Sequence, residues 1–447
     1  MAKYFGTNGV RRLYDELTPD FVAGLCNAFA EWAGKGTILV ARDTRVTGEV
    51  LEHAVLAGLL SAGNDVVRLG IAPSPLVEWR VRQGGTAGAV IITASHNPPE
   101  WNALKFVDGQ GMAVSRERGE EIERIFEGRR KHVTWGEVGG ERADGSAQGE
   151  YIRAVAAAVD RKAIARARLS LILDCGNGTA CGIGPTLFRR LGCRVEALNS
   201  QPDGFFPGRA SEPTEANIKD LIESVREAGA DAGMAWDGDC DRVVMVDERG
   251  NYVIGDRVFA LCARIKLESH RGPVVSTVST TRAVEDIAKK FGQETVYCKV
   301  GAPYISERMR EIGAVIGGEE VGGVVWPEHS WGKDGFYSAA KIVERMAVEG
   351  KRLSELLAEL PRYYNAKTKI EVPPQKKAEA VARIAEEMAG RGRLTTIDGA
   401  RLDVRDGWVI ARASGTENYI RVFAEAKSAE RANALMQEWA TRVRRLL

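Results

Sequence analysis

The sequence lacks an excess of charge of either sign, and it lacks any long apolar run. Its 447 residues include 62 Lys and Arg against 61 Asp and Glu, a formal net charge of +1. Binding to nucleic-acid phosphates needs a basic surface, so we expect no nucleic-acid partner. No segment approaches the roughly 18–20 apolar residues of a membrane span, and the N-terminal residues have no apolar signal core. The sequence therefore predicts a cytoplasmic protein with no membrane partner.

Paired cysteine motifs are also missing. The seven cysteines are scattered, with no Cys-x-x-Cys pair. This pattern predicts free thiols in a reducing compartment and excludes a disulfide framework or a zinc site of the usual spacing. Glycine, in contrast, is abundant, at 49 residues. This abundance predicts many tight turns, or close approaches between backbone and ligand.

The central part of the chain has the pattern of α/β modules. Short runs rich in β-branched residues alternate with amphipathic segments from residue 37 to about 365. Segments 38–41, 65–69 and 89–92 are predicted strands, and 18–32 and 49–62 are predicted helices. The same pattern begins again near Leu171 and near Val274. The sequence thus predicts three tandem α/β modules with mixed, largely parallel sheets.

After Tyr364 the pattern changes to that of an α+β domain. The predicted strands are 368–372, 401–404, 408–412 and 419–424, and an amphipathic helix is predicted at 428–446. A polar, Gly-rich segment at 136–149 is the predicted linker after the first module. The predicted domains are 1–150, 151–252, 253–366 and 367–447.

A first candidate site is Thr93-Ala-Ser-His-Asn-Pro-Pro-Glu, directly after the predicted strand 89–92. In open α/β sheets, ligands bind beyond the carboxyl ends of the strands, where Ser95 and His96 would lie. A serine beside a histidine can be a nucleophile with its base, although a polar turn is the simpler interpretation. The sequence contains neither the G-x-S-x-G nor the S-x-x-K pattern here, which disfavours acyl transfer.

A second candidate site is Asp237-Gly-Asp-Cys-Asp-Arg, after the predicted strand 232–236. Three carboxylates at alternating positions converge only around a positive charge, and a hard divalent cation is the natural partner. A solvated acidic turn is the alternative. A calcium-binding EF-hand is excluded because Arg242 stands where that loop requires glycine. Three protein ligands leave positions for a substrate oxygen, which favours magnesium at a phosphate.

Two further loops carry weaker signals. In the segment 412–421, hydroxyls and free N–H groups lie between two arginines, which is typical of a phosphate nest, with an ordinary turn as the alternative. In the segment 317–323, two glutamates lie among four glycines, as in a loop that holds hydroxyl groups, with a flexible acidic loop as the alternative. The segment 176–182 lacks the spacing of a dinucleotide-binding loop.

Together these motifs resemble the α-D-phosphohexomutase superfamily over nearly the whole chain. The resemblance implies four domains around a central cleft, each of which supplies one loop. It also implies an enzyme that interconverts hexose 6-phosphate and hexose 1-phosphate through a phosphoserine and a bisphosphorylated sugar. The Gly-Glu-Glu-x-Gly-Gly form and the Trp326-Pro-Glu-His segment look most like archaeal members, which are phosphoglucosamine mutases or phosphomannomutase/phosphoglucomutases. The motifs that carry the resemblance are 5–11, 70–75, 93–98, 237–242, 299–301, 318–320 and 412–417.

The resemblance also implies roles for single residues. Ser95 would carry the phosphoryl group and, with Asp237, Asp239 and Asp241, would bind Mg²⁺. The other residues implied at the reaction centre are Arg11, His96, Lys105 and Arg242. The residues implied in substrate binding are Lys299, Glu319, Glu320, Arg412, Ser414, Gly415, Thr416 and Arg421. A hexose 1,6-bisphosphate is the expected activator.

Two departures from the family pattern affect the chemistry. Val321 replaces a Ser or Asn in the sugar loop and removes a hydrogen bond to a sugar hydroxyl. Gly323 stands where bacterial relatives carry a histidine proposed to move protons, so the general acid and base are left unassigned. Asn8, Arg12 and Asn418 also depart from the usual residues.

Glucosamine phosphate is the favoured substrate, and mannose or glucose phosphates are the alternative. Two functions of other classes are a metal-dependent sugar phosphatase that uses the same serine and a non-catalytic sugar-phosphate sensor. The partner in each case is a small sugar phosphate. The sequence does not distinguish a monomer from a homo-oligomer.

Overall fold

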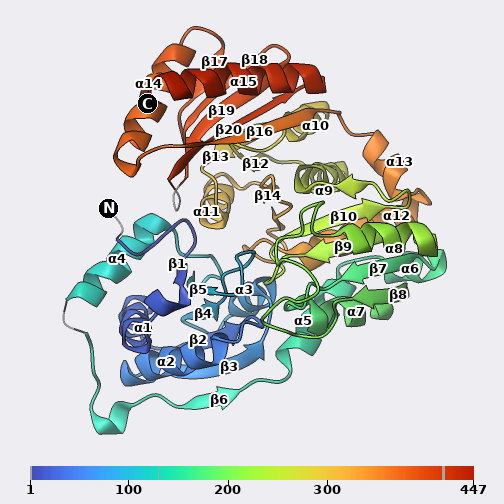
Figure 1. The fold of residues 1–447 in the computed structure, drawn as a ribbon. Helices are drawn as coiled ribbons and strands as arrows, with labels where there is room; N and C mark the ends of the chain where they lie inside the picture. The colour runs from blue at the N-terminus through green and yellow to red at the C-terminus, as the bar shows by residue number, and fades with distance from the viewer. Residues whose placement is uncertain (1–2, 129, 415–417) are drawn as a thin grey trace.

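The computed structural model describes residues 3–128, 130–414 and 418–447. These residues form four sheets that follow one another in chain order, three with helices on both faces and a fourth with helices on one (Figure 1). The predicted fold class is confirmed: three mixed α/β modules precede an antiparallel C-terminal sheet. The predicted domain limits stay predictions.

The first sheet has six strands in the order β1-β5-β4-β2-β3-β6. Strands β4, β2, β3 and β6 are parallel, whereas β5 is antiparallel to both β4 and β1. Its strands are β1 (Val10–Leu13), β2 (Thr37–Arg42), β3 (Asp65–Ile71), β4 (Gly88–Ile92), β5 (Trp101–Asp108) and β6 (Glu141–Ala143). Its helices are α1 (Pro19–Ala33), α2 (Gly48–Ser61), α3 (Ser74–Arg82) and α4 (Arg116–Glu127).

The second sheet has the order β11-β10-β9-β7-β8, with β9, β7 and β8 parallel. Its strands are β7 (Ser170–Asp174), β8 (Arg194–Leu198), β9 (Ala232–Trp236), β10 (Val243–Asp247) and β11 (Tyr252–Val253). Its helices are α5 (Ala147–Ala157), α6 (Arg161–Ala167), α7 (Ala180–Leu191) and α8 (Lys219–Ala228). The turn between β9 and β10 holds the three aspartates.

The third sheet has the order β13-β12-β14-β15, with only β15 antiparallel to its neighbour. Its strands are β12 (Val274–Thr277), β13 (Thr295–Cys298), β14 (Ile316–Gly318) and β15 (Val324–Val325). Its helices are α9 (Gly255–Ser269), α10 (Arg282–Lys290), α11 (Ala302–Ile312), α12 (Gly335–Glu349) and α13 (Leu353–Ala358).

The fourth sheet is antiparallel, in the order β16-β20-β19-β18-β17. Its strands are β16 (Tyr364–Glu371), β17 (Arg393–Thr395), β18 (Ala400–Val404), β19 (Gly407–Ala413) and β20 (Tyr419–Ala426). Its helices are α14 (Lys377–Met388) and α15 (Ala429–Arg445).

Sequence patterning located many of the buried strands and the helices α1, α2 and α15, but it did not predict the other helices individually. The predicted linker 136–149 contains β6, which pairs in parallel with β3 through Val66 and Glu141. All three residues of β6 are exposed, so this edge strand has no apolar alternation that a sequence pattern would show. Helix α14 was also missed, and β16 begins at Tyr364, before the predicted 368.

One large apolar core joins the second and third modules to one face of the first sheet. Trp79 of α3, Tyr151 of α5, Trp236 of β9 and Phe336 of α12 are all buried in it. Helices α1, α2 and α4 cover a second core on the other face of the first sheet, and the fourth sheet has a core of its own. The first three modules are therefore fused by packing, whereas the fourth is packed largely by itself.

The seven cysteines are free thiols, as predicted, and six of them are buried. Within the described residues, no helix combines the length and the apolar character needed to cross a bilayer.

The packing of α2 against α1 in the first module depends on Gly58 of α2. A Cβ atom at this position would lie 2.2 Å from the carbonyl oxygen of Ala23 and 3.0 Å from the backbone nitrogen of Asn27, both in α1. Backbone atoms cannot yield as a flexible side chain does, so an added methyl must push the two helices apart.

We therefore expect Gly58→Ala to destabilise the first module by roughly 1–3 kcal/mol. Differential scanning calorimetry should show a melting transition several degrees lower. Gly136→Ala is the matched control, because a Cβ there meets no atom within 4 Å. Equal melting temperatures for the two variants would show that α1 and α2 do not need this close approach.

Candidate active site

Ser95 lies at the carboxyl end of β4 in a strained backbone conformation. Its φ is 55°, a left-handed value that serine rarely adopts, and its side chain is almost fully buried. The backbone N–H of Ser95 donates to Oγ1 of Thr93 at 2.9 Å, and its own Oγ donates to Oδ2 of Asp237 at 2.7 Å. The loop therefore aims the serine hydroxyl at the aspartate loop of the second module.

Arg45, which the sequence analysis did not select, holds the serine loop in this conformation. Its guanidinium is fully buried and pairs with Asp43 at 3.0 Å. It also donates to the carbonyl oxygens of Ser95 at 3.1 Å and Asn97 at 2.6 Å, and to that of Pro98. The guanidinium of Arg45 thus donates hydrogen bonds to several backbone carbonyl groups of the serine loop.

His96 is adjacent to the serine hydroxyl but faces two cations. Its Nδ1 lies 3.2 Å from the Oγ of Ser95 and accepts a hydrogen bond from Arg242 at 3.0 Å. Burial, and then Arg242 and Arg11, lower the pKa of His96 well below its usual value. The imidazole is therefore neutral at neutral pH, with Nδ1 as an acceptor.

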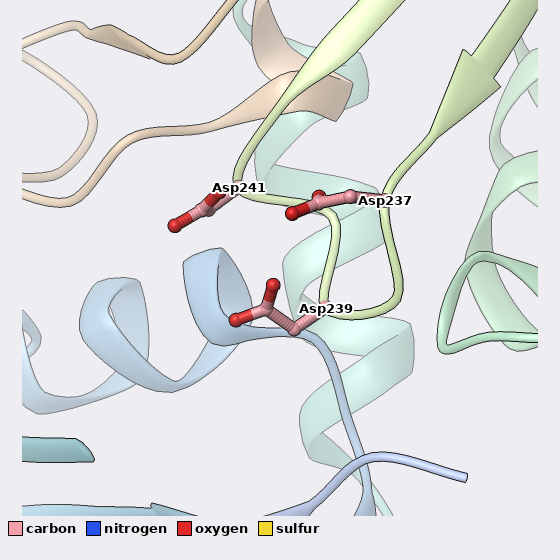
Figure 2. Close-up of side chains that lie close together, drawn as sticks. All are labelled: Asp237, Asp239 and Asp241. Carbon is pink, nitrogen blue, oxygen red and sulfur yellow. The ribbon is translucent and has the colours of Figure 1, made fainter. Parts of the chain in front are cut away.

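The three aspartates converge as predicted. Figure 2 shows Asp237, Asp239 and Asp241 on the turn between β9 and β10, with their carboxyl groups directed to one side of that turn. All three are buried, and one oxygen from each lies within 4.8 Å of the others. Cys240 in the same turn has a φ of 62°, the second strained residue of the centre.

The unsatisfied oxygens of this cluster fit a hard metal ion. Oδ2 of Asp239 accepts from Ser74 and Lys105, both at 2.5 Å, and Oδ2 of Asp241 lies 3.2 Å from Lys333. The other oxygen of each, Oδ1, is buried and has no hydrogen-bond partner among the described residues. Buried carboxylate oxygens left without donors are the ligands that Mg²⁺ prefers.

Cations from two other modules balance the charge of the aspartates. Burial would raise the pKa of Asp241, but Lys333, Lys105 and Arg242 hold it well below its usual value. Burial, together with the other two aspartates, raises the pKa of Asp237 to about 7. The loop therefore contains one strongly ionised carboxylate and one that binds a proton near neutral pH when no metal is bound.

The sugar loop predicted at 317–323 is the hairpin between β14 and β15, and it packs directly on the aspartate loop. The backbone N–H of Val243 donates to the carbonyl oxygen of Gly322 at 3.3 Å. Glu319 accepts from Lys333 at 2.5 Å, and Lys333 in turn pairs with Asp241. Through Lys333, Glu319 of the sugar loop lies next to the aspartate loop.

Arg11 also lies at the centre, half-buried on β1. It donates to Oδ1 of Asn97 at 2.7 Å, and burial lowers its pKa to about 10, with nearby Arg242 acting in the same direction. Lys105 on β5 lies 2.5 Å from Asp239 and 3.6 Å from Asp241. All five predicted catalytic residues are therefore grouped around the three aspartates.

The other predicted substrate-binding residues make contacts elsewhere. Glu320 pairs with Lys367 of β16 at 2.5 Å, and Lys299 pairs with Glu117 of α4 at 2.8 Å. Each pair joins the third module to another module. These contacts place Glu320 and Lys299 at the boundaries between modules.

The predicted phosphate nest lies at the end of β19 and the start of β20. Arg412 and Arg421 are paired across these two strands, and Arg412 also bonds Asp398 at 2.7 Å. Ser414 is buried, and its backbone N–H donates to the carbonyl oxygen of Tyr419 at 3.0 Å. Gly415 and Thr416 lie outside the described residues.

Glu78 is a further buried acid that the sequence analysis missed. It belongs to α3, and a Cβ added at Gly332 would meet its carboxylate, so the glutamate packs directly against the residue before Lys333. Burial raises the pKa of Glu78 to about 8, although Lys105 and Lys333 act against this rise. Glu78 forms no recognised motif, and its neighbours Leu76, Val77 and Trp79 mark this part of α3 as a core segment.

Models of the four phosphoglucomutase/phosphomannomutase domains match successive parts of the chain. The α/β/α domains I, II and III match residues 2–132, 149–250 and 254–364, and the C-terminal domain matches residues 368–442. The chain belongs to the phosphoglucomutase/phosphomannomutase family. Its members form part of the α-D-phosphohexomutase superfamily that the motifs resembled.

Full-length relatives agree with this assignment. A phosphoglucomutase/phosphomannomutase of Thermococcus kodakarensis is 42% identical over 98% of this chain and 97% of its own length. A protein of Methanopyrus kandleri named "Probable phosphoglucosamine mutase" is 41% identical over 100% of this chain and 98% of its own. The crystal structure of a phosphoglucomutase/phosphomannomutase family protein from Burkholderia thailandensis superposes with a TM-score of 0.88 at 26% identity, covering 99% and 97% of the two chains.

The family assignment establishes the class of reaction. The protein is a phosphohexomutase, an intramolecular phosphotransferase of the isomerase class, and its substrate is a sugar phosphate. The buried aspartate cluster is the candidate metal centre of this phosphohexomutase.

The raised pKa of Glu78 predicts a pH-dependent stability difference. Its folded pKa of about 8 lies above its usual 4.5, so the folded state keeps a proton that the unfolded state loses. The stabilisation from this proton is complete below about 4.5 and is lost as the pH rises through about 8. Glu78→Gln, which stays neutral, should therefore become more stable relative to the native protein between pH 5 and pH 8.5. The melting temperatures of both proteins, measured across this range, test the effect. A constant difference between the two melting temperatures at every pH would contradict it.

Proposed function

We propose that this phosphohexomutase transfers phosphoryl groups through Ser95 and isomerises hexose 6-phosphates to hexose 1-phosphates. The observation that carries the proposal is the position of the Ser95 hydroxyl, 2.7 Å from Asp237 and beside the cluster of three aspartates. The strained φ of Ser95 supports a functional role, because such strain is retained where the surrounding structure enforces it.

The chemistry is an exchange of two phosphoryl groups at one serine. In the first transfer, a free sugar hydroxyl attacks the phosphorus, the bond from phosphorus to Oγ of Ser95 breaks, and the proton of the sugar hydroxyl passes to the freed Oγ. The resulting sugar bisphosphate reorients, and its other phosphoryl group passes back to Oγ of Ser95. The second transfer reverses these bond and proton changes at the other sugar oxygen. A hexose 1,6-bisphosphate would activate the enzyme, because it can transfer one phosphoryl group to an unphosphorylated Ser95.

The residues around Ser95 supply the charge stabilisation that phosphoryl transfer needs. Arg242 is close to His96 and to two of the aspartates, and Arg11 and Lys105 add two more cations at the same centre. These fixed positive groups would stabilise the negative charge on the transferred group. His96 is neutral, accepts a hydrogen bond from Arg242 through Nδ1, and lines the same centre beside Ser95.

The aspartates would hold Mg²⁺, with Ser95 as a further ligand. The orphaned Oδ1 atoms of Asp239 and Asp241 and the nearby carboxylate of Asp237 form an oxygen donor set suited to this ion. A bound Mg²⁺ supplies Lewis-acid stabilisation of phosphoryl oxygens. The phosphate that does not react would be held by Arg412, Ser414, Gly415, Thr416 and Arg421.

Glucosamine phosphate is the proposed substrate. Its amino group is cationic at neutral pH. The sugar loop carries two carboxylates, Glu319 and Glu320, each of which pairs with one lysine through one oxygen and keeps acceptor capacity for a second partner. The Methanopyrus relative, named "Probable phosphoglucosamine mutase", matches the whole chain. Glucose and mannose phosphates are the second candidates, because the Thermococcus phosphoglucomutase/phosphomannomutase is equally similar.

Phosphorus NMR tests both the reaction and its substrate. The purified protein would receive Mg²⁺, a trace of hexose 1,6-bisphosphate and one of glucosamine, mannose or glucose 6-phosphate. Growth of a 1-phosphate signal, fastest with glucosamine, is the expected result. Release of inorganic phosphate alone would instead identify a phosphatase, and an unchanged spectrum with unphosphorylated Ser95 would favour a sensor.

Ser95→Ala should abolish isomerisation, because no other atom replaces the oxygen that carries the phosphoryl group. The loss should exceed about 1,000-fold, as is typical when a covalent nucleophile is removed. Ser61→Ala, in α2 of the same module, is the control and should retain activity. The assay is the same NMR measurement, and substantial turnover by Ser95→Ala would disprove the phosphoserine route.

Asp239→Asn should weaken Mg²⁺ binding by about 10-fold or more, because a neutral amide is a poorer ligand for a hard cation. Isothermal titration calorimetry with Mg²⁺ alone measures this affinity directly. Asp220→Asn, an exposed residue in the first turn of α8, serves as the charge-matched control. If both variants bind Mg²⁺ as the native protein does, Asp239 is not a ligand.

A further inference from the structure

Lys333 connects two loops that the sequence analysis treated separately. Its Nζ lies 2.5 Å from Oε1 of Glu319 in the sugar loop and 3.2 Å from Oδ2 of Asp241 in the aspartate loop. Only 4% of its side chain is exposed. A single buried ammonium is therefore shared by carboxylates from two modules.

The backbone around Lys333 is fixed on both sides. Lys333 forms an isolated bridge with Val325, and the next residue, Asp334, donates its N–H to the carbonyl oxygen of Val324 at 2.9 Å. The side chain of Asp334 then caps α12 by accepting from the N–H of Tyr337 at 2.8 Å. The ammonium of Lys333 is thus presented from a rigid base between β15 and α12.

Gly323 leaves the space that the lysine side chain occupies. A Cβ at this position would lie 2.4 Å from Cδ and 3.1 Å from Nζ of Lys333. Gly323 is not among the glycines with positive φ, so the backbone conformation does not demand glycine. The need for glycine at 323 comes from the lysine stem that passes over it.

The two carboxylates depend on Lys333 to different degrees. Asp241 has further cations nearby, with Lys105 at 3.6 Å and Arg242 at 3.6 Å. For Glu319, Lys333 is the only side chain that donates a hydrogen bond to its carboxylate within the described part of the chain. Loss of the ammonium would therefore free Glu319, whereas Asp241 would keep cationic neighbours.

We propose that Lys333 is a positioning residue for sugar recognition. It holds the Glu319 carboxylate against the aspartate loop, in the orientation in which Glu319 meets the sugar, and Gly323 is required to admit it. The role of Glu319 toward the sugar rests on the proposed function. The position of the Glu319 carboxylate is a structural observation and does not rest on the proposed function.

The first experiment replaces Lys333 by methionine, which keeps an unbranched stem without the charge. Lys333→Met should raise the KM for glucosamine 6-phosphate by roughly 10- to 100-fold, the usual effect of losing a hydrogen bond to a charged group. The kcat should fall by a smaller factor than the KM rises, because Asp241 loses one neighbouring cation but keeps Lys105 and Arg242. Lys351→Met, on the surface, is the control. A native KM for Lys333→Met, or a fall confined to kcat, would overturn the proposal.

The second experiment tests whether position 323 acts through the lysine. Gly323→Ala should raise the KM, because its Cβ displaces the lysine stem. In a Lys333→Ala background, where the lysine stem is absent, Gly323→Ala should cause no further rise in the KM. If Gly323→Ala raises the KM by the same factor in both backgrounds, position 323 does not act through Lys333. If the Lys333 variants fail to fold, the KM of Gly323→Ala, which keeps the lysine and both carboxylates, tests the proposal alone, and a native KM for this variant would overturn it.

Crystal structures of the native protein and of Lys333→Met separate this inference from the proposed function. In the variant, the Glu319 carboxylate should turn away from Asp241, whatever the substrate of the enzyme is. An unmoved Glu319 would overturn the positioning role even if the mutase reaction is confirmed. If the native enzyme isomerises no hexose phosphate, the proposed function is wrong. The comparison of the two crystal structures still decides whether Lys333 positions Glu319.

Discussion

The neutralisation of three buried aspartates is the constraint on which the rest of the structure depends. Carboxylates this close and this deeply buried repel one another and are costly to desolvate. The balancing cations come from the strand β5 of the first module, from the aspartate loop itself and from the segment before α12, as Lys105, Arg242 and Lys333. The aspartate loop therefore needs the first and third modules around it, and the shared apolar core of the three modules provides that arrangement.

The sequence revealed those parts of the site that lie in compact motifs at strand ends. Ser95 and the aspartates are such residues, since several polar groups in one short loop make a visible pattern. Arg45, Glu78 and Lys333 were not predicted, because the loops of the site that they contact lie elsewhere in the chain. The one local partner, Asp43 beside Arg45, forms no recognised motif with it. Nothing in the local sequence distinguishes such a residue from one exposed to solvent.

The same reasoning explains how well the fold was predicted. Central strands such as β2 and β4 are buried on both faces and appear as continuous apolar runs, so their positions were found to within one or two residues. The edge strand β6 pairs with β3 through the backbone, and all three of its residues are exposed. Its sequence therefore has no apolar alternation by which it could be predicted. The order of the strands within each sheet was not predicted, because pairing between distant strands is not encoded in the local residue pattern.

The separate core of the fourth sheet has a consequence for motion. This sheet meets the third module through a small apolar contact of Val278 with Trp408 and Ile410, and through polar bonds such as that of Arg401 to the carbonyl oxygen of Val278. Such interfaces resemble those between transiently associated proteins, and relative movement across them is the ordinary expectation. The fourth sheet can therefore rotate as one body while its own packing stays intact. In amide hydrogen exchange it would open as a cooperative unit distinct from the three fused modules.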